Sequence, residues 1–427
     1  MAGRDAKDAP KASACVDGER LWARLMELAS FGATAGGGVR RLALSREEWA
    51  ARAKLIEWAR PIGLEPSVDP ASNLFLRLPG ADPGLAPLLI GSHLDSQPTG
   101  GKFDGAYGVV AALEALEAIR ALALTPRRPI ELAIWMNEEG ARFAPGMMGS
   151  AAFAGLRGLE EIKSVRDRAG VSVGEALAAL GEAEAALPRR PLGFKAAGFV
   201  EAHIEQGVTL QNEGLDIGVV TGIQGKRTFR VEVTGMESHA GASSRAQRRD
   251  ALVSAIAIVR ALHAAMWDEE DLVRFTIGMF TVSPNAPSVV PGRVIFSIDL
   301  RHDDADTIRR LGDAIAEICQ AARGACDVTV RELLYDAPLE FPSAIRRLIG
   351  RTASGLGLAW REMPSPAGHD ARYLHSVCPT GMIFIPCRDG ISHNEAEEIN
   401  PIHATAGARV LADVACALAE AKAFAEV

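Results

Sequence analysis

Two nearly continuous apolar segments, with a helical segment between them, constrain the fold of this chain most strongly. The first reads A-P-L-L-I-G-S-H-L over residues 86–94, and the second reads I-E-L-A-I-W-M and ends just before Asn137. Residues 106–123 between them have the apolar spacing of a helix. Strands that are apolar on both faces are typical of parallel sheets with helices on both sides. The sequence therefore predicts a parallel βαβ unit, with reactive groups beyond the carboxyl ends of its strands.

The pattern changes after residue 220, which predicts a second domain. This region has the order strand, helix, two strands, helix, strand, with its helices at 250–266 and 305–322. A βαββαβ order is that of a ferredoxin-like domain. The parallel-sheet pattern then resumes with a helix at 343–356 and the strand G-M-I-F-I-P, so the second domain is an insertion. We expect an α/β protein with three parts: a disordered N-terminal extension at 1–18, a mostly parallel-sheet domain formed by 19–219 plus 335–427, and the ferredoxin-like insertion at 220–334.

The composition excludes several classes of protein. A formal net charge of -8 argues against a sequence-independent nucleic-acid binder, which needs a basic surface to displace counterions. The six cysteines have no C-x-x-C spacing, which favours free thiols in a reducing cytoplasm. The N-terminus lacks the apolar stretch of a secretory signal, and no uninterrupted apolar run reaches the ~20 residues that span a bilayer. We expect a cytoplasmic protein that binds neither nucleic acid nor membranes.

Five possible metal ligands occur where predicted strands end in polar or Gly-rich turns. Imidazole and carboxylate ligands suit Zn²⁺ or another borderline divalent ion, and two ions about 3.5–4 Å apart need a carboxylate that bridges them. We predict Asp104 as this bridge, with His93 and His203 completing one site and Glu139 and His393 the other. A histidine taken alone is more often structural. It is the complete set that favours a dinuclear centre.

Two acidic residues beside these ligands also have predicted roles. Glu138 precedes Glu139 at the end of a strand, where adjacent side chains point different ways, so Glu138 is free to act as a general base. Asp95 follows His93 by two residues, on the same side of an extended chain, and is placed to orient the imidazole. Four histidines lack a partner motif and are interpreted as structural: His263, His302, His375 and His403.

Five sequence blocks together resemble a known family. They read G-S-H-L-D-S-Q-P-T-G-G-K-F-D-G, N-E-E-G-A-R-F, H-I-E-Q-G, S-H-A-G and A-G-H-D-A. From about residue 20 to its end, the chain resembles the dinuclear zinc amidohydrolases related to aminoacylases and carboxypeptidases. The H-I-E-Q-G and A-G-H-D blocks are similar to the branch of L-carbamoylases, allantoate amidohydrolases and β-ureidopropionases. This resemblance implies the same ligand assignment and the same base, Glu138.

The resemblance also implies a role for the inserted domain as a lid and dimerisation domain. It implies that this domain supplies His239 to an active site of the partner subunit, where an imidazole can hydrogen-bond a developing oxyanion. The alternative for His239 is a loop histidine that caps its own turn. Arg301 matches the arginine that binds the substrate carboxylate in the family. Gln206, Arg227 and Gly368 match further substrate contacts, with structural roles as the alternative for the first two.

The chain departs from the family pattern at two places near the expected substrate. Ser288 stands where the family often has Asn, so an amide contact is replaced by a hydroxyl. Pro366 changes the turn before Gly368, and proline fixes φ and removes an N–H. The resemblance makes the following His369-Asp370 a structural pair that supports this turn rather than metal ligands. Both departures leave the metal chemistry intact and put the identity of the substrate in question.

The predicted activity is metal-dependent hydrolysis of a linear amide C–N bond. The expected substrate is an N-carbamoyl-L-amino acid or a related ureido acid such as allantoate, with release of ammonia, and of CO₂ in the decarbamoylating case. The expected cofactors are two divalent ions per subunit, Zn²⁺ first, with Mn²⁺, Co²⁺ or Ni²⁺ compatible with the same ligands. The expected partner is a second copy, bound through the inserted domain. Two alternatives are an aminoacylase or dipeptidase with the same centre, and a catalytically silent member kept for binding, which the complete ligand set disfavours.

Overall fold

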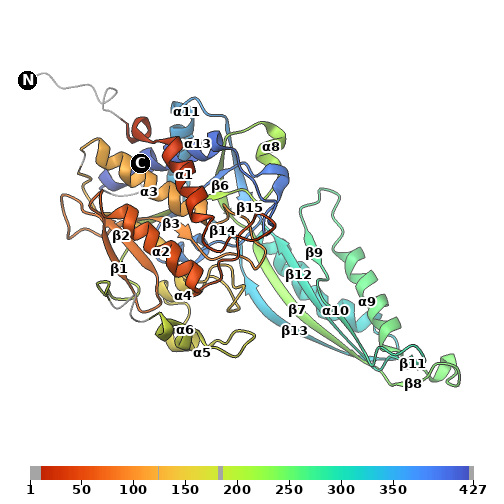
Figure 1. Cartoon of the computed structure of the whole chain (residues 1–427). Helices are drawn as coiled ribbons and strands as arrows, with labels where there is room; N and C mark the ends of the chain where they lie inside the picture. Colours follow the sequence, from red (N-terminus) through yellow and green to blue (C-terminus); the bar gives the residue numbers. More distant parts are fainter. Residues whose placement is uncertain (1–10, 124, 181–185, 423–427) are drawn as a thin grey trace, which may run out of the picture. The chain divides into compact units, whose positions relative to one another are not determined.

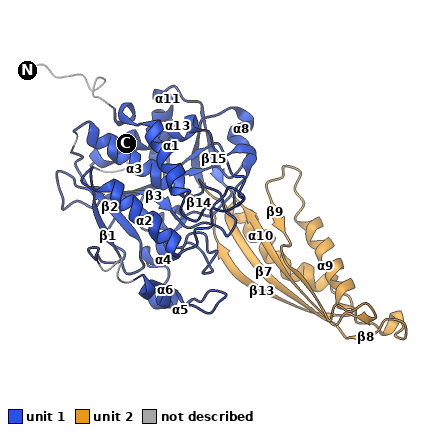
Figure 2. Cartoon of the chain, viewed as in Figure 1, with its two compact units in different colours: residues 1–221, 341–427 blue, residues 222–340 orange. Residues whose placement is uncertain are grey.

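The chain folds into two compact units. A computed structural model describes residues 11–123, 125–180 and 186–422. The larger unit combines residues up to Thr221 with Phe341 onwards, and the smaller unit is Gly222–Glu340 (Figures 1 and 2). The predicted insertion spans 220–334, and the smaller unit extends further because its last long strand continues to Asp336.

A nine-stranded sheet forms the centre of the larger unit (Figure 1). Its order is β1-β2-β4-β3-β5-β16-β6-β14, with β15 paired to β6. The four central strands are parallel neighbours, and the flanking pairs β1-β2, β2-β4, β16-β6 and β6-β14 are antiparallel. The predicted parallel sheet is therefore confirmed at its centre. The strands are β1 (Glu65–Val68), β2 (Leu74–Leu78), β3 (Leu88–His93), β4 (Ile130–Trp135), β5 (Gly198–Ile204), β6 (Ile217–Ile223), β14 (Leu339–Glu340), β15 (Trp360–Ser365) and β16 (Thr380–Ile385).

Two apolar helices pack together against the central strands. Helix α3 (Ala106–Ala121) connects β3 to β4, as the βαβ pattern predicts, and packs on α13 (Pro401–Glu420). Both helices are rich in Ala and Val, and their buried side chains join one core with β3, β5 and β16. By length and composition alone α13 is able to span a membrane, but 61% of its apolar window is buried inside the fold. It therefore serves here as a core helix.

Shorter helices complete the larger unit. Helix α1 (Gly18–Leu28) begins at Asp17, whose carboxylate accepts from the backbone N–H groups of Glu19 and Arg20. Helix α2 (Arg46–Ala59) begins at Ser45, as predicted, with the hydroxyl accepting from Glu48 N. The others are η1 (Ala12–Cys15), α4 (Met148–Phe153), α5 (Leu159–Ser164), α6 (Val173–Ala179), α8 (Thr209–Glu213), α11 (Ser343–Gly355), α12 (Ala371–Leu374) and η3 (Arg388–Gly390).

The N-terminal segment differs from its prediction. The expected disordered extension covers residues 1–18, of which 1–10 lie outside the described residues. Residues 11–18 are ordered: the backbone N–H and hydroxyl of Ser13 both donate to the Asp413 carboxylate, at 2.8 and 2.7 Å. Ala12 and Ser13 are buried, and η1 packs on α3 and α13. The polar, Ala-rich pattern does not reveal the order of this segment because its contacts are with distant residues: Ser13 bonds Asp413, 400 positions away, and Asp17 N donates to Glu114, 97 positions away.

The smaller unit is an antiparallel sheet with two helices on one face. Its sheet has the order β10-β12-β7-β13, with β9 also paired to β12. Its main elements follow the βαββαβ order that the sequence predicts, and the first of the two middle strands is divided into β9 and β10. The elements are β7 (Gly225–Thr234), β8 (Ser238–His239), η2 (Arg245–Gln247), α9 (Ala251–Ala265), β9 (Arg274–Thr276), β10 (Phe280–Ser283), β11 (Val289–Val290), β12 (Arg293–His302), α10 (Ala305–Ala322) and β13 (Asp327–Asp336).

Candidate metal centre

Three predicted ligands meet at the carboxyl ends of the central strands. His93 ends β3, His203 lies in β5, and Asp104 lies in the turn before α3. Asp104 Oδ1 lies 3.1 Å from His203 Nε2 and 3.6 Å from His93 Nε2. All three side chains are buried, and one ligand atom from each lies within 4.8 Å of the others. The first predicted ligand set is therefore brought together.

Both of these histidines are oriented by backbone carbonyls. His93 Nδ1 lies 3.0 Å from the carbonyl oxygen of Asp95, and His203 Nδ1 lies 2.9 Å from that of Ile204. A carbonyl oxygen only accepts, so each Nδ1 carries the hydrogen. The Nε2 atoms consequently face Asp104, and in the neutral form of each ring Nε2 carries the lone pair that binds a metal.

The second predicted ligand set meets on the other oxygen of Asp104. His393 Nε2 lies 3.3 Å from Asp104 Oδ2 and 3.3 Å from Glu139 Oε2. His393 is half exposed and has a left-handed backbone, with φ of +54°. Asp104 thus presents Oδ1 to one ligand set and Oδ2 to the other, as a bridging carboxylate requires.

A glycine beside Asp104 leaves room for His93. Gly105 has φ of +64°, and a Cβ built there would lie 2.4 Å from His93 Cε1. Any side chain at this position would displace the imidazole or the turn. The Phe-Asp-Gly turn therefore carries a ligand and accommodates a second one.

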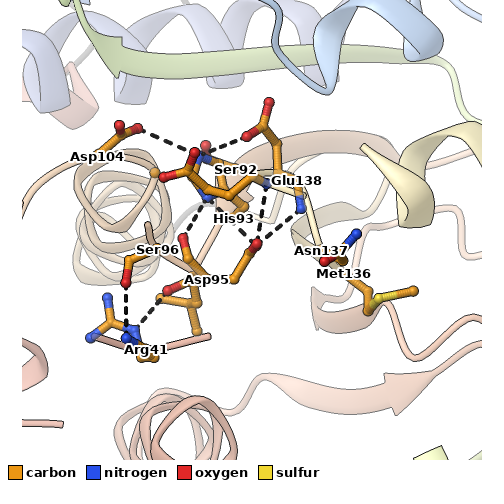
Figure 3. A network of polar contacts seen from close by, with 12 residues as sticks. Arg41, Ser92, His93, Asp95, Ser96, Asp104, Met136, Asn137 and Glu138 are labelled. Carbon is orange, nitrogen blue, oxygen red and sulfur yellow. Dashed lines mark hydrogen bonds and ion pairs between the residues drawn. The ribbon is translucent and has the colours of Figure 1, made fainter. Parts of the chain in front are cut away.

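Asp95 supports both His93 and the glutamate pair. Its carboxylate oxygens accept from the backbone N–H groups of Glu138 and Glu139 at 3.0 and 3.1 Å, as Figure 3 shows for Glu138. The carboxylate lies 3.7 Å from His93 Nδ1, so it is the Asp95 carbonyl, rather than the carboxylate, that holds the ring. Arg41 fixes the same turn by donating from Nε to the Leu94 carbonyl at 2.7 Å.

Glu138 lies beside the first ligand set without joining either set. Its Oε2 lies 3.7 Å from His93 Nε2, and its side chain is 10% exposed. Figure 3 shows it next to His93, on the side opposite Arg41. This is the position of a carboxylate that is free to accept a proton from a water at the centre.

Burial, together with repulsion from neighbouring carboxylates, disfavours the ionised form of both glutamates at the centre. Burial raises the pKa of Glu138 well above its usual range and the pKa of Glu139 to about 7, with Asp104 adding to the latter. The hydrogen bond to Asp104 raises the pKa of His393 to about 9. Burial lowers the pKa of His93, but Glu138 and Asp104 outweigh burial and raise it well above the usual range. Cations placed among these groups would relieve the repulsion.

The residues present fit a pair of divalent ions. Imidazole nitrogens and carboxylate oxygens are the ligands of Zn²⁺ and similar ions. Gln206 adds a polar side chain with an unpaired oxygen. Its Nε2 donates to Asp104 Oδ2 at 2.9 Å, while its buried Oε1 has no hydrogen-bond partner among the described residues. Gln206 also has a left-handed backbone, with φ of +57°. Gln206, predicted from the sequence as a substrate contact, lies beside Asp104 and Ser392, and its role toward the substrate stays a prediction.

The turn at residues 365–370 is built on a buried polar network. The His369 ring contacts the His203 ring at 4.5 Å, and its Nε2 lies 3.0 Å from Ser365 Oγ. Asp370 accepts a hydrogen bond from the Ser150 hydroxyl. These partners agree with a structural pair. Ligand atoms of His369, His203 and Glu201 also lie within 4.8 Å of one another, so the structural role of His369 stays a prediction. Gly368 itself is exposed, and a Cβ there would lie 3.3 Å from Met147 Cε.

His239 and Ser288 lie side by side in the smaller unit. Strand β8, which ends at His239, pairs with β11, and the Ser288 carbonyl accepts from Ala240 N at 3.0 Å. His239 Nδ1 accepts from the N–H groups of Gly241 and Ala242 at 3.0 and 3.1 Å. His239 therefore caps its own turn, and the same bonds leave the hydrogen on Nε2, an exposed donor.

Arg301 and Arg227 point to opposite faces of the smaller sheet. Arg301 pairs in register with Lys226, and its guanidinium donates to the Asp299 carboxylate at 2.8 and 3.3 Å. Arg227 is buried on the helix side, where Nε and Nη2 donate to Glu332 and Nη1 donates to Asp313. The structure therefore does not bring the two arginines together. It favours the structural alternative for Arg227, because all three of its nitrogens are already used.

Three residues at the centre were missed from the sequence. Gln97 donates to Glu139 Oε2 at 2.8 Å, Ser392 donates to Asp104 Oδ2 at 3.0 Å, and Glu397 accepts from Asp104 N at 3.0 Å. Gln97 and Glu397 each follow a ligand histidine by four residues, and Ser392 directly precedes one. Their closeness in sequence to the ligand histidines is the only feature that indicates a role. Polar residues in loops are usually solvated, so their residue type alone does not indicate one. The four histidines interpreted as structural take no part in either ligand set.

Comparison with known proteins defines the class of the chain. Residues 89–417 match the peptidase family M20/M25/M40, and the chain belongs to this family. An N-carbamoyl-L-amino-acid amidohydrolase from Rhizobium meliloti is 37% identical, with 94% of this chain and 97% of that protein aligned. An allantoate amidohydrolase from Bacillus subtilis is 34% identical, with 92% and 95% aligned. A hydantoinase/carbamoylase family amidase from Burkholderia multivorans has a similar structure, with a TM-score of 0.85, 41% identity, and 95% and 98% coverage. The family resemblance drawn from the motifs is confirmed.

Proposed function

We propose that this protein hydrolyses the linear amide C–N bond of an N-carbamoyl-L-amino acid or a related ureido acid such as allantoate. One observation carries the proposal: the two oxygens of Asp104 face two separate ligand sets, while Glu138 stands beside them uncommitted. The names of the full-length relatives support the same bond and the same substrate class. The proposed cofactors are two divalent ions, Zn²⁺ first, with Mn²⁺, Co²⁺ and Ni²⁺ also suited to the ligands.

The protein residues have distinct roles in the proposed reaction. Divalent ions at such a centre make a water more acidic and polarise the carbonyl oxygen. Glu138 accepts a proton from the attacking water and transfers it to the leaving nitrogen. Asp95 holds the backbone of Glu138, which keeps the base at a fixed place. Release of ammonia then follows from cleavage of the C–N bond, and in a decarbamoylation the remaining carbamate loses CO₂.

We assign the smaller unit the role of lid and dimerisation domain. The Nε2–H of His239 is an exposed donor suited to the oxyanion of the tetrahedral intermediate. Ser288 lies next to it, and Arg301 is the proposed partner of the substrate carboxylate. Val253 and Ile256 on α9 and Phe280 on the edge strand β10 are exposed apolar side chains, which supports an interface with a second copy. The six free cysteines fit the proposed cytoplasmic location.

A substrate panel tests the proposed function. Metal-free protein is reconstituted with Zn²⁺, Mn²⁺, Co²⁺ or Ni²⁺ and incubated with N-carbamoyl-L-amino acids, N-carbamoyl-β-alanine and allantoate, and ammonia is measured. Parallel reactions with N-acyl amino acids and dipeptides are followed with ninhydrin. We expect ammonia release and no cleavage of the second group. Cleavage of the second group alone would replace the proposal with an aminoacylase or dipeptidase, and no cleavage in a fully metallated protein would support a silent member.

A further inference from the structure

Glu397 joins the two loops that complete the centre. Its Oε1 accepts from the backbone N–H groups of Phe103 and Asp104 at 2.8 and 3.0 Å. Its Oε2 lies 3.1 Å from the Ser392 hydroxyl oxygen, which also lies 3.0 Å from Asp104 Oδ2. The side chain is 2% exposed. One buried carboxylate therefore connects the turn that carries Asp104 to the loop that carries His393.

Gly101 leaves space for the Glu397 carboxylate because it has no side chain. A Cβ built on Gly101 would lie 2.0 Å from Glu397 Cδ and 2.1 Å from Oε1. No side chain at position 101 is compatible with the observed position of Glu397. Gly101 and Glu397 are almost 300 residues apart in sequence, so their fit is a property of the folded centre.

The two ligand sets depend on this connection to different extents. His93 ends β3 and His203 lies in β5, and these strands are parallel neighbours that pair as far as Ile90 and Val200. The two imidazole rings lie 5.8 Å apart. Asp104 is common to both sets. The second set has no pair of strand histidines, because His393 lies in a loop and is half exposed. Loss of the Glu397 connection should therefore affect the second set more than the first.

We propose that Glu397 is a positioning residue. It fixes Asp104 and His393 relative to each other, so that both can bind the same ion together with Glu139. The inference rests on the proposed function, since it concerns the same centre. Its test is metal binding and requires no substrate. A protein that binds metal as described below but cleaves no ureido acid would refute the proposed function and leave this inference standing.

Calorimetric titration of metal-free protein with Zn²⁺ provides the test, with four variants beside the wild type. Glu397→Ala removes the carboxylate, and Gly101→Ala displaces it without changing any ligand. Glu397→Gln keeps the connection, because its amide oxygen accepts from both N–H groups and its NH₂ donates to the Ser392 oxygen. Glu398→Ala is the control: Glu398 is the neighbouring glutamate, is exposed, and pairs with Arg388.

We expect two ions on the wild type, on Glu397→Gln and on Glu398→Ala with similar affinities. On Glu397→Ala and Gly101→Ala, we expect one ion with nearly unchanged affinity and the other roughly 10–100-fold weaker, as for other groups that orient metal ligands. Circular dichroism and the melting temperature of each metal-free variant show whether it is folded. Wild-type affinity for both ions on Glu397→Ala would overturn the inference. So would parallel loss of both ions, or a Glu397→Gln protein as impaired as Glu397→Ala.

Discussion

Replacing Asp95 by Asn is the most direct perturbation of the proposed centre that leaves every ligand in place. Each carboxylate oxygen of Asp95 accepts one backbone N–H, from Glu138 at 3.0 Å and from Glu139 at 3.1 Å. Asparagine has one carbonyl oxygen, so one of these N–H groups would face an NH₂ group instead of an acceptor. Both N–H groups belong to the residues that supply the proposed base and a ligand.

The geometry sets the size of the expected effect. Leaving one buried N–H group without an acceptor costs about 1–3 kcal/mol, so we expect the free energy of unfolding of the metal-free protein to fall by about 2 kcal/mol. Groups that orient metal ligands typically contribute a factor of about 10–100 in metal affinity or activity. We expect turnover of the best ureido substrate at saturating metal to fall by a factor in this range.

Ammonia release under saturating metal and urea unfolding of the metal-free protein measure the two effects. Asp69→Asn is the control, because Asp69 is also buried and accepts from backbone N–H groups, those of Ala71 and Asn73. We expect Asp69→Asn to retain wild-type turnover. Asp95→Asn with wild-type turnover, or equal losses of turnover in both variants, would refute the role assigned to Asp95.

Three further predictions concern the base, the metals and a buried carboxylate. Glu138→Gln with both ions bound should lower turnover by roughly 10²–10⁴-fold, because the general base is lost; near wild-type ammonia release by a fully metallated variant would contradict this role. Chelation should abolish activity and lower the melting temperature, since ions that bind only the folded state add about 4 kcal/mol of stability at 1,000 times their Kd; an unchanged melting temperature would argue against two bound ions. Burial raises the pKa of Asp69 to about 6, above its value in the unfolded chain, so its contribution to stability is present at low pH and is lost as the pH rises through about 6. Lowering the pH from 7 to 4.5 should therefore stabilise the wild type by about 2 kcal/mol relative to Asp69→Asn in urea unfolding, and an identical change in both proteins would contradict the raised pKa.

The sequence predicts the parallel centre of the sheet because its strands are apolar on both faces. The segments around Leu88 and Ile130 are read as strands with little ambiguity, and the ligands His93 and Glu139 follow from their ends. The antiparallel flanks are less visible. Strand β1 is short and mostly polar, and it is stabilised by pairing with β2 rather than by its own pattern.

The contacts that orient the ligands are the part that sequence reasoning misses. The place of Asp95 suggests a bond to His93, whereas its carboxylate accepts from two N–H groups more than 40 residues away. Arg227 shows the same limit: a family position suggests substrate, but the alternation of side chains along β7 turns it toward Asp313 on α10. The hydrogen-bond partners of Asp95 and Arg227 depend on which distant residues lie next to them, and only the folded chain determines these neighbours.

The strand order of the larger unit has a consequence for how the protein is made. Strand β16 comes from the last fifth of the chain, yet it lies between β5 and β6, which precede the smaller unit in sequence. As the polypeptide leaves the ribosome, the contiguous stretch 222–340 is able to fold before β16 is made. Until then, the edge of β5 that pairs with β16 has no neighbouring strand. Loss of the final segment would remove His393 and β16 together, so a nascent chain that stops early would lack both a finished sheet and a competent centre.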